Sequence, residues 1–398
     1  MERPLHSAVD RIELLKLSCK LTEPIGNAVR FFDRRDTLLV KITTKDGITG
    51  WGETWAQPAA AAALIHSSFG PALLGEDVRF PQRVWRKLTR IIVNDRRGLS
   101  HMAISALDMA IWDAAARTEG VPLAAKLGGA LRHRLSCYAS GPFIKPGPDP
   151  YGHYLEAVGG YVDQGFRHVK VRAGIGVRED AELVRRIRGL VGDEVGLMVD
   201  FNEAGDVAQA QAFARQTSDC GLVWMEEPVP HDDLPAWRRA AATVPMALAG
   251  GESLYGLSGF RDYLAAGVFA VVQPDLALCG GVTEALRIMA LAEAFNVPVV
   301  PHVWGGAVAF AAGLQFTALL PDRSRPGQRY PFFEYDASIN SLRDGLAEFP
   351  LVADGMVEVP QLPGLGIEIE DRNIAPFLTE RIELRDTAAP QTTRGERL

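Results

Sequence analysis

The segment FRHVKVRAG (166–174) alternates between polar and apolar side chains, which is typical of a β-strand with one buried face. Successive side chains of a strand point to opposite faces, so His168, Lys170 and Arg172 share one face. Valine and alanine side chains occupy the other face and predict packing against helices. The polar face is therefore expected to line a site.

Similar short strands recur from about residue 135, and most intervals between them could hold an amphipathic helix. Strands that alternate with helices imply an α/β fold built from parallel βαβ units. Eight strands in roughly 200 residues is the number in a (β/α)8 barrel, although a doubly wound sheet also alternates in this way. The expected strands are CYASG (137–141), HVKVRAG (168–174), GLMVDFN (196–202), LVWMEEP (222–228), MALAGGES (246–253), VFAVVQPD (268–275), VPVVPHV (297–303) and FFEYD (332–336).

The chain before this repeat is rich in strand signals and then becomes helical. The helical signal is clearest in SHMAISALDMAIWDAAARTEG (100–120), where Ser100 is predicted to cap the helix. The sequence KDG marks a hairpin turn, so an antiparallel meander is expected. The expected strands are RIELLKLSCKL (11–21), TLLVKITTKDG (37–47) and ITGWGETW (48–55).

Four parts are predicted along the chain from these changes of pattern. An α+β unit is followed by the barrel, by a segment of short strands and turns that packs back on the first unit, and by a disordered tail. The apolar stretch AVAFAAGLQFTALL (307–320) is short enough to be a buried helix inside the barrel. The predicted bounds are 1–130, 135–340, 341–385 and 386–398.

The composition excludes several classes of function. The chain has 398 residues, of which 47% are hydrophobic and 23% charged, as in ordinary globular proteins. A formal charge of -7 without long basic runs argues against nucleic-acid binding. No stretch has the pattern of a signal peptide or a membrane span. The cysteines lack the spacing of a zinc site or disulfide framework, so we expect reduced thiols and a cytoplasmic location; they are Cys19, Cys137, Cys220 and Cys279.

Three carboxylates follow three consecutive predicted strands. They are Asp200, Glu226 and Glu252, and each is separated from the next by one strand and one helix. Barrel enzymes build their sites at the carboxyl ends of the strands, so these carboxylates are expected to meet there. Three such groups repel one another unless a cation lies between them, and a set of oxygen ligands suits Mg²⁺. The alternative is that they cap helices or pair with arginines.

The later strands end in Asp275, His302 and Glu334. A carboxylate one strand away from a histidine can bind its Nδ1–H and leave Nε2 free for proton transfer. His302 is therefore the best candidate for a general base, with Asp275 as its partner. A lone histidine is otherwise more often structural than catalytic.

The strand with Lys170 and Arg172 precedes the strand that ends at Asp200, and Asn202 follows Asp200 at the same spacing of two residues. We predict that these polar side chains face the same site. In the alternative interpretation, Lys170 and Arg172 form salt bridges with the carboxylates and take no part in a catalytic step.

The motifs at the predicted strand ends, among them DFN (200–202), EEP (226–228) and GGES (250–253), resemble those of the enolase superfamily, and specifically of its mandelate racemase subgroup. The resemblance extends over nearly the whole chain. The resemblance implies a capping domain, formed by both ends of the chain, over a modified (β/α)7β barrel. It also implies Mg²⁺ bound by Asp200, Glu226 and Glu252, with the adjacent Glu227 outside the ligand set. The motifs are DFN (200–202), EEP (226–228), GGES (250–253), QPD (273–275), PHVWG (301–305), FEYD (333–336) and the helix ISALDMAIWD (104–113).

The subgroup's shared step is removal of the proton α to a substrate carboxylate, with the enediolate stabilised by the metal. The resemblance implies that Lys170 acts as an electrophile for the substrate carboxylate and that Glu334 donates or shares a proton with it. The subgroup's racemase has Lys-x-Lys where this chain has Lys170 and Arg172. Arginine is a poor base because its pKa lies above about 12. The substitution therefore argues against a two-base racemase.

The leading hypothesis is a lyase that dehydrates an acid sugar, an aldonate or aldarate, to a 2-keto-3-deoxy acid. His302 would remove the α-proton or instead protonate the departing 3-hydroxyl group, with Arg172 or Lys170 positioning the opposite side. The alternatives are a racemase or epimerase of a 2-hydroxy acid, in which Lys170 or a perturbed Arg172 supplies the second base, and a non-catalytic binding protein for sugar acids. Substrate contacts are expected from Lys170, Asn202 and Glu334, and from Arg30 and Trp51 in the cap segments TEPIGNAVRFFDRR (22–35) and GWGETW (50–55). A homo-oligomer is expected because symmetric assemblies are common.

Overall fold

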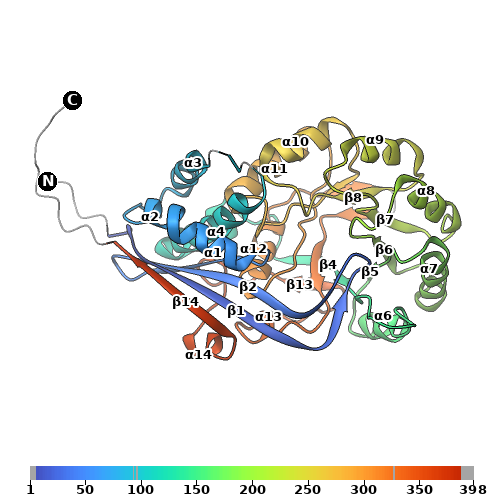
Figure 1. The fold of residues 1–398 in the computed structure, drawn as a ribbon, viewed down its shortest axis with the longest axis horizontal. Helices are drawn as coiled ribbons and strands as arrows, with labels where there is room; N and C mark the ends of the chain where they lie inside the picture. The colour runs from blue at the N-terminus through green and yellow to red at the C-terminus, as the bar shows by residue number, and fades with distance from the viewer. Residues whose placement is uncertain (1–5, 93, 96, 326–327, 387–398) are drawn as a thin grey trace, which may run out of the picture.

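The computed structural model describes residues 6–92, 94–95, 97–325 and 328–386, without the side chains of residues 324–329. A four-stranded antiparallel sheet with helices lies beside a curled parallel sheet that is surrounded by helices (Figure 1). We call the first part the capping domain and the second the barrel. The predicted fold class is confirmed.

Both ends of the described chain contribute strands to the capping sheet, whose order is β14-β1-β2-β3. The first and last strands of the chain pair antiparallel, with Arg11 opposite Arg385. All three strands predicted before residue 56 are present, and the KDG turn is a hairpin in which Gly47 adopts a φ of 85°. The strands are β1 (Val9–Gly26), β2 (Phe31–Thr44), β3 (Thr49–Thr54) and β14 (Leu378–Arg385).

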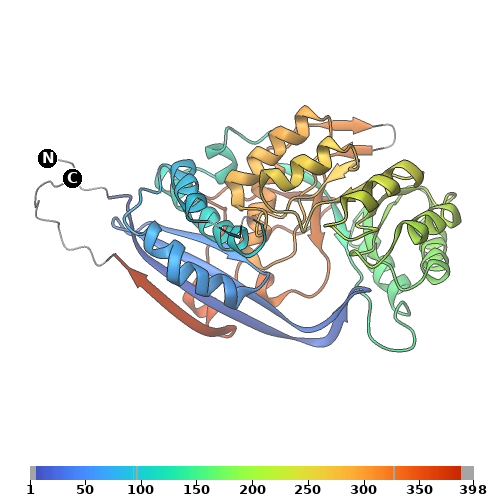
Figure 2. The ribbon, with the colours of Figure 1, turned by 45° about the horizontal axis from the view of Figure 1, so that its top comes forward.

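The β1–β2 hairpin is longer than the rest of the sheet, and its far end extends towards the barrel (Figures 1 and 2). The pairing between the two strands is irregular between Lys20 and Ile25, so this end is separated from the regular sheet. The Asn27 side chain accepts hydrogen bonds from the backbone N–H groups of Val29 and Arg30, at 2.9 and 3.0 Å, and so fixes the turn.

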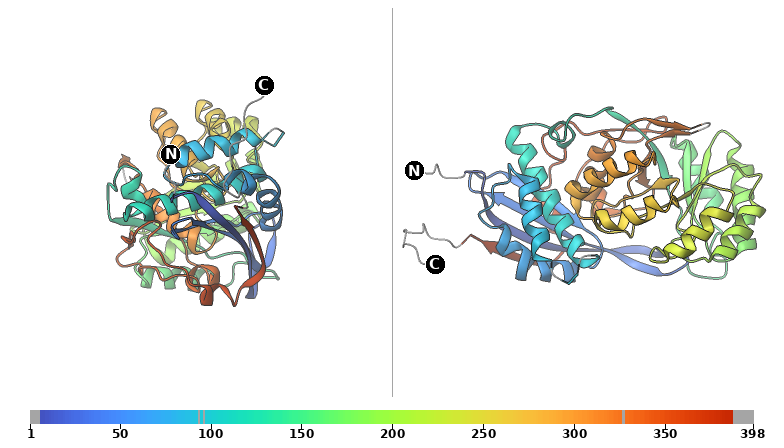
Figure 3. Two further views of the ribbon diagram at one scale, coloured as in Figure 1. Left: turned by 90° about the vertical axis from the view of Figure 1, so that its left-hand side faces the viewer. Right: turned by 90° about the horizontal axis from the view of Figure 1, so that it is seen from above.

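Helix α4 (Leu99–Glu119) is buried along most of its length because it packs both on β3 and on helix α11 of the barrel (Figure 3). Gly50 and Gly52 make the contact with β3 possible: a Cβ at Gly52 would lie 1.7 Å from the carbonyl oxygen of Ala106. The predicted cap by Ser100 is wrong. The helix starts one residue earlier, and the Ser100 N–H donates to the side chain of Asp95 at 2.8 Å.

The other helical segments of the capping domain are short and follow β3 along the chain. They are α1 (Pro58–Leu64), a π-helix (Ile65–Phe69), α2 (Gly70–Leu73), α3 (Pro81–Ile91) and α5 (Leu123–Lys126).

The barrel has seven strands in the order β12-β4-β5-β6-β7-β8-β9. An eighth segment forms parallel bridges from Val299 to Val272 of β9 and from His302 to Asp275, which follows β9. All eight predicted strand positions are therefore present, with helices between them, which gives the (β/α)7β order. The apolar stretch from residue 307 forms the buried helix α12, as predicted. The strands are β4 (Arg134–Ser140), β5 (His168–Arg172), β6 (Gly196–Asp200), β7 (Leu222–Glu226), β8 (Leu248–Gly250), β9 (Val271–Val272) and β12 (Phe333–Asp336). The helices are α6 (Tyr154–Asp163), α7 (Val177–Val191), α8 (Val207–Gln216), α9 (Leu234–Thr243), α10 (Gly256–Ala265), α11 (Gly281–Ala294) and α12 (Ala307–Thr317).

The remaining elements are a small hairpin before β12 and the short elements between β12 and β14. The strand β13 pairs antiparallel with β4, which ties this part of the chain to the barrel. The predicted tail lies outside the described residues, apart from Asp386, and the other domain bounds remain predictions. No described helix is long and apolar enough to cross a membrane, and the four cysteines are free thiols. The elements are β10 (Arg323–Arg325), β11 (Gln328–Tyr330), α13 (Ser341–Asp344), β13 (Met356–Glu358) and α14 (Asp371–Ile374).

Glu53, on β3, fastens the capping domain to the barrel. Its fully buried carboxylate accepts hydrogen bonds from the Thr37 hydroxyl at 2.7 Å and from the backbone N–H groups of Gly306 and Ala309, at 2.6 and 2.8 Å. The two N–H groups lie at the start of α12, where backbone donors have no partner within the helix. A capping-domain side chain thus supplies the N-terminal acceptor of a barrel helix.

Two carboxylates of α4 make further connections. Asp108 accepts hydrogen bonds from the backbone N–H and the hydroxyl of Thr283, at 2.8 and 2.7 Å, at the start of α11. Asp113 accepts from the backbone N–H groups of Trp51 and Leu365, at 2.8 and 2.7 Å. Burial raises the pKa of Asp108 to about 7. The capping sheet, the barrel and the segment after β12 therefore share buried hydrogen bonds.

The close approach of α4 to β3 predicts a matched pair of stability effects. We expect Gly52→Ala to lower the free energy of unfolding by about 2 kcal/mol, because the new Cβ overlaps a backbone oxygen. Gly159→Ala, inside α6 with nothing within 4 Å of the added Cβ, is expected to raise it by about 0.5–1 kcal/mol. Urea unfolding measures both, and equal effects of the two substitutions would contradict the contact.

Candidate active site

A cavity of about 410 Å³ lies between the barrel and the capping domain. Its barrel side is formed by residues at or after the carboxyl ends of the strands, as expected for this fold. Its cap side is formed by the β1–β2 hairpin and the residues after β3. The barrel side includes Phe143, Arg172, Asn202, Glu252, His302 and Trp304, and the cap side includes Asn27, Arg30, Phe32, Arg34, Arg35 and Trp55.

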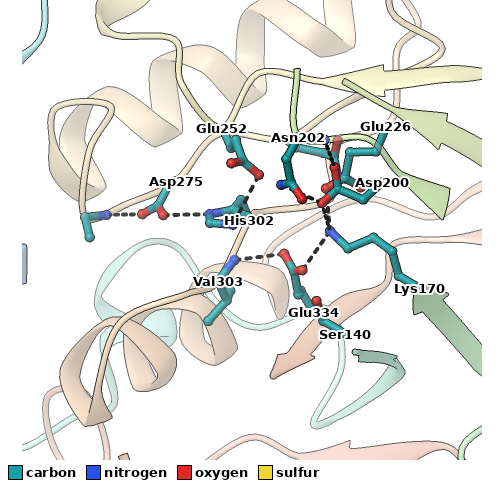
Figure 4. A network of polar contacts seen from close by, with 12 residues as sticks. Ser140, Lys170, Asp200, Asn202, Glu226, Glu252, Asp275, His302, Val303 and Glu334 are labelled. Carbon is teal, nitrogen blue, oxygen red and sulfur yellow. Dashed lines mark hydrogen bonds and ion pairs between the residues drawn. The ribbon is translucent and has the colours of Figure 1, made fainter. Parts of the chain in front are cut away.

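Asp200, Glu226 and Glu252 form a carboxylate triad at the ends of three neighbouring strands (Figure 4). One oxygen from each lies within 4.8 Å of the others. Asp200 and Glu226 are fully buried, and Glu252 is partly exposed. The adjacent Glu227 is buried but is not part of this group. All three candidate ligand atoms are carboxylate oxygens, which fits a divalent cation such as Mg²⁺.

Glu226 shows the electrostatic cost of placing these carboxylates together. Burial raises its pKa to about 7, with Asp200 adding to the rise and Lys170 opposing it. Its Oε2 is held by two neutral donors, the indole N–H of Trp224 at 2.9 Å and the amide of Gln273 at 2.7 Å. A cation at the triad would relieve the repulsion, so the charges and the donor atoms both fit a metal.

Lys170 lies at the centre of a buried ion-pair network. Its Nζ donates to Glu226, lies 2.8 Å from Oε1 of Glu334 and lies 3.8 Å from Oδ2 of Asp200. Burial alone would lower the pKa of Lys170, but Glu226 and Glu334 raise it above its usual value. Lys170 is therefore a protonated ammonium group in this environment.

Arg172 lies next to Lys170 on the same face of β5 and lines the cavity. Its Nη1 is 3.0 Å from Oδ2 of Asp200, and its Nη2 donates to the hydroxyl of Ser140 at 3.3 Å. Burial would lower the pKa of Arg172, but Asp200 and nearby glutamates raise it further above its usual value. Lys170 and Arg172 thus both form salt bridges with the carboxylates, as in the alternative interpretation of the sequence.

His302 and Asp275 form a hydrogen-bonded pair. Nδ1 of His302 is 2.7 Å from Oδ2 of Asp275, and Nε2 lies 3.2 Å from Oε2 of Glu252 (Figure 4). The same Oδ2 of Asp275 accepts the indole N–H of Trp55 at 2.9 Å. Burial lowers the pKa of His302, but Glu252, Glu334 and Asp275 together raise it to about 10.

Glu334 is buried on β12, and its expected role as a group that donates or shares a proton stays a prediction. Its Oε1 pairs with Lys170, and its Oε2 accepts the backbone N–H of Val303 at 3.0 Å. Burial raises the pKa of Glu334, but Lys170, His302 and Arg172 lower it to about 2. These contacts allow Glu334 to hold Lys170 in place.

Asn202 lies in the cavity wall, directly after β6. Its side-chain amide donates to Oδ2 of Asp200 at 3.0 Å, and its backbone N–H donates to Oδ1 of the same residue at 2.8 Å. Its φ of 43° turns the chain sharply at the end of the strand. Asn202 therefore both orients Asp200 and faces the cavity.

The structure corrects the prediction for one cap residue. Trp51 is 2% exposed and belongs to the hydrophobic core with Leu15 and Leu39, away from the cavity. Trp55, on the same strand segment, lines the cavity instead. Arg30 lines the cavity, and its expected contact with substrate stays a prediction.

Several cavity and triad neighbours were not predicted to be site residues. Phe143 follows β4, and Trp304 belongs to the PHVWG motif; the centres of their rings lie 5.1 Å apart. Trp304 also stacks on Arg35, whose guanidinium carbon is 3.8 Å from the centre of the indole ring. The polar strand-end pattern points to residues that carry charge and misses these aromatic walls. Trp224 lies two residues before Glu226, and Gln273 lies two residues before Asp275, so each shares a strand face with a predicted site residue. This spacing was the sequence feature from which they could have been predicted.

Two segments of the chain match known families. Residues 11–128 match the mandelate racemase / muconate lactonizing enzyme N-terminal domain. Residues 153–373 match the enolase C-terminal domain-like family. The two matched segments contain the capping-domain helices and most of the barrel.

Individual relatives match over nearly the same length. D-galactarolactone cycloisomerase from Agrobacterium fabrum is 35% identical over 364 residues, which are 91% of this chain and 96% of the relative. D-galactonate dehydratase from Xanthomonas axonopodis pv. citri is 31% identical over 353 residues, 84% of this chain and 89% of that protein.

Solved structures of other proteins also match nearly the whole chain. The 3,6-anhydro-D-galactonate cycloisomerase from Zobellia galactanivorans has a TM-score of 0.85 and 30% identity, and the match covers 94% of this chain and all of that one. The L-talarate/galactarate dehydratase from Salmonella typhimurium LT2, solved with Mg and L-lyxarohydroxamate, has a TM-score of 0.85 and 25% identity, and the match covers 95% of each chain. With both family matches and the carboxylate triad, these likenesses show that the chain is an enzyme of the enolase superfamily, in its mandelate racemase and acid sugar dehydratase group.

Proposed function

We propose that this enzyme removes the proton α to the carboxylate of an acid sugar and then expels the oxygen substituent at the β-carbon. When that substituent is a hydroxyl group, the reaction is a dehydration that yields a 2-keto-3-deoxy acid. The observation that carries the proposal is the His302–Asp275 pair beside the carboxylate triad at a single cavity.

Removal of an α-proton places negative charge on the oxygens of the substrate carboxylate. Positive charge at that position therefore binds the transition state more tightly than the ground state. Mg²⁺ held by Asp200, Glu226 and Glu252 supplies such charge when it is bound. Lys170 adds a protonated ammonium group from the chain itself, held in place by Glu226 and Glu334.

His302 is proposed as the base. Asp275 accepts the Nδ1–H, and Nε2 faces Glu252 and the cavity. Glu252 is the neighbour that most raises the pKa of His302, so a cation that neutralises Glu252 at the triad would lower this pKa and leave a lone pair on Nε2 for the α-proton. The proton that His302 takes from the α-carbon can leave with the β-hydroxyl group as water. The enol that results takes up a proton at C3 and becomes the 2-keto acid, so the base is regenerated.

Arg172 supports elimination over racemisation. A racemase needs a competent base on each side of the α-carbon, whereas the elimination needs one. The ion pair between Arg172 and Asp200 keeps the guanidinium protonated. Lys170 would have to lose its proton between Glu226 and Glu334, which the two ion pairs oppose.

A cycloisomerase is a second candidate, because the relatives and solved structures described above include two cycloisomerases. If the β-oxygen belongs to a ring, its expulsion opens the ring and no water is lost. The same base and the same charged groups serve both reactions, so the substrate decides the outcome.

The homo-oligomer and the cytoplasmic location stay predictions.

Incubation in D₂O with Mg²⁺ and a set of aldonates, aldarates and their lactones tests the proposal. We expect a 2-keto product with deuterium at C3 that is lighter than the substrate by one water, as measured by mass spectrometry and NMR. His302→Asn is expected to lower kcat by about 10²- to 10⁴-fold, because the base is lost. His66→Asn, at an exposed site in the capping domain, serves as the control.

Each other outcome of this experiment has a distinct meaning. A keto product that has lost no water and differs in mass from its substrate only by the incorporated deuterium identifies a cycloisomerase. Deuterium at C2 with inversion and no keto product supports the racemase and contradicts the proposal. No exchange with any acid, together with an effect of His302→Asn on affinity alone, supports a binding protein.

Metal binding at the triad predicts a thermal shift. We expect Mg²⁺ to stabilise the protein by about 2.7 kcal/mol at a concentration one hundredfold above its Kd. Glu252→Gln is expected to reduce that shift strongly because it removes one charged ligand, whereas Glu358→Gln, at an exposed site on β13, is expected to leave it unchanged. Removal of Mg²⁺ by a chelator should abolish α-proton exchange. An unaltered shift in Glu252→Gln would place the metal elsewhere.

Trp55, in the capping domain, is predicted to position the His302–Asp275 pair, which we call the dyad. Trp55→Phe removes the N–H donor to Asp275, and we expect kcat to fall about five- to tenfold with little change in KM. Trp304→Phe alters the cavity wall without a donor to Asp275 and is expected to change KM more than kcat. Steady-state kinetics with the substrate found above measure both. Equal changes in the two variants would assign Trp55 to packing alone.

A further inference from the structure

The three cap arginines that line the cavity have different surroundings. Arg35 is buried and paired: its Nη2 lies 2.9 Å from Asp336 and donates to the Ser338 hydroxyl at 2.6 Å, and its guanidinium stacks on Trp304, whereas its buried Nε has no hydrogen-bond partner in the described part of the chain. Its charge is therefore already balanced inside the protein. Arg35 holds the cap hairpin on the barrel and has little capacity left for a ligand.

Arg30 and Arg34 are available, in contrast. Both are exposed residues that line the cavity. Arg30 has no side-chain hydrogen bond or ion pair among the described residues. Arg34 has one long ion pair, 3.8 Å from Nε to the exposed Asp33, and its side chain is 54% exposed. Such a pair contributes little because solvent screens it.

The other charged groups of the cavity wall either form ion pairs within the protein or are negatively charged. On the barrel side, Arg172 pairs with Asp200, and His302 pairs with Asp275 and Glu252. On the cap side, the exposed Asp36 lies in the wall with the two arginines. Two unengaged cations and one anion leave the cap side with a net charge of +1.

We propose that Arg30 and Arg34 form a subsite for a second carboxylate, so that the preferred substrates are diacids of the aldarate type. The inference rests on the proposed function, which places the reacting carboxylate of the substrate at the triad. A carboxylate at the far end of the same molecule then meets the cap arginines. Guanidinium groups bind carboxylates through two parallel hydrogen bonds between opposite charges, whereas the terminal hydroxymethyl group of an aldonate offers one uncharged acceptor oxygen.

The turn that carries Arg30 supports this role. Asn27 accepts the backbone N–H of Arg30, and the Asn27 N–H donates to the Arg30 carbonyl at 3.1 Å, so the start of the side chain is fixed. The tip of the hairpin also contacts the barrel, since a Cβ at Gly174 would lie 3.0 Å from the Cβ of Ala28. The backbone is held while the side chain stays free for a ligand.

Matched pairs of acids test the subsite. We would measure kcat/KM for galactarate against galactonate and for glucarate against gluconate, in the wild type, Arg30→Gln and Arg34→Gln. The wild type is expected to favour the diacids, and each substitution to lower kcat/KM for the diacid about tenfold while the monoacid changes little. Arg83→Gln is the matched control, because Arg83 is a capping-domain arginine of similar exposure, 58%, outside the cavity.

Calorimetry of the Mg²⁺-loaded protein with the same four acids gives a readout that does not depend on turnover. The subsite is supported if the diacids bind more tightly and the preference is lost in both arginine variants. It is overturned if diacids and monoacids bind equally, or if the substitutions weaken both acids to the same extent. A monoacid that exchanges its α-proton without a diacid preference would overturn the subsite and leave the proposed function intact.

Discussion

The balance of buried charge at the carboxyl ends of the barrel strands is the constraint on which this structure depends. Four carboxylates that approach one another in low-dielectric surroundings need cations within contact distance, because unpaired buried charge costs several kcal/mol per group. Lys170 supplies one cation to Glu226 and Glu334, and Arg172 supplies another to Asp200. Both come from one short strand, so its register and its position between β4 and β6 are fixed by electrostatics as well as by its valines. Glu252, the third carboxylate of the triad, lies 3.2 Å from Nε2 of His302, and a divalent cation between the three carboxylate oxygens would add further positive charge to the group.

The capping domain is part of the site because its side chains form hydrogen bonds with barrel residues at the site. Glu53 supplies acceptors to the start of α12, and Trp55, two residues later, supplies a donor to Asp275. One strand end therefore both fastens the cap and contacts the dyad. The orientation of His302 consequently depends on residues that lie more than two hundred positions earlier in the chain.

The strand ends were predictable from the sequence because polar residues recur there with the spacing of one strand and one helix. That regularity located Asp200, Glu226, Glu252, Asp275 and His302, and the structure brings all five together. The cap contacts were not predictable in the same way, since they join residues far apart in the sequence. Trp51 and Trp55 have the same residue type in one short motif, and only the packing of α4 against β3 places one in the core and the other at the cavity. Likewise, nothing local distinguishes Arg35 from Arg30 and Arg34, because its partner Asp336 lies on the last barrel strand.

The irregular pairing between Lys20 and Ile25 has a consequence for how such an enzyme diversifies. Beyond it, the end of the β1–β2 hairpin is no longer in register with the regular capping sheet, which α4 and Glu53 anchor to the barrel. Changes of length or side chain at this tip leave the sheet, the triad and the dyad where they are. If Arg30 and Arg34 select the substrate as proposed, substrate preference and chemistry are encoded in separable parts of the chain, the preference in a surface hairpin and the catalytic step at the ends of the barrel strands.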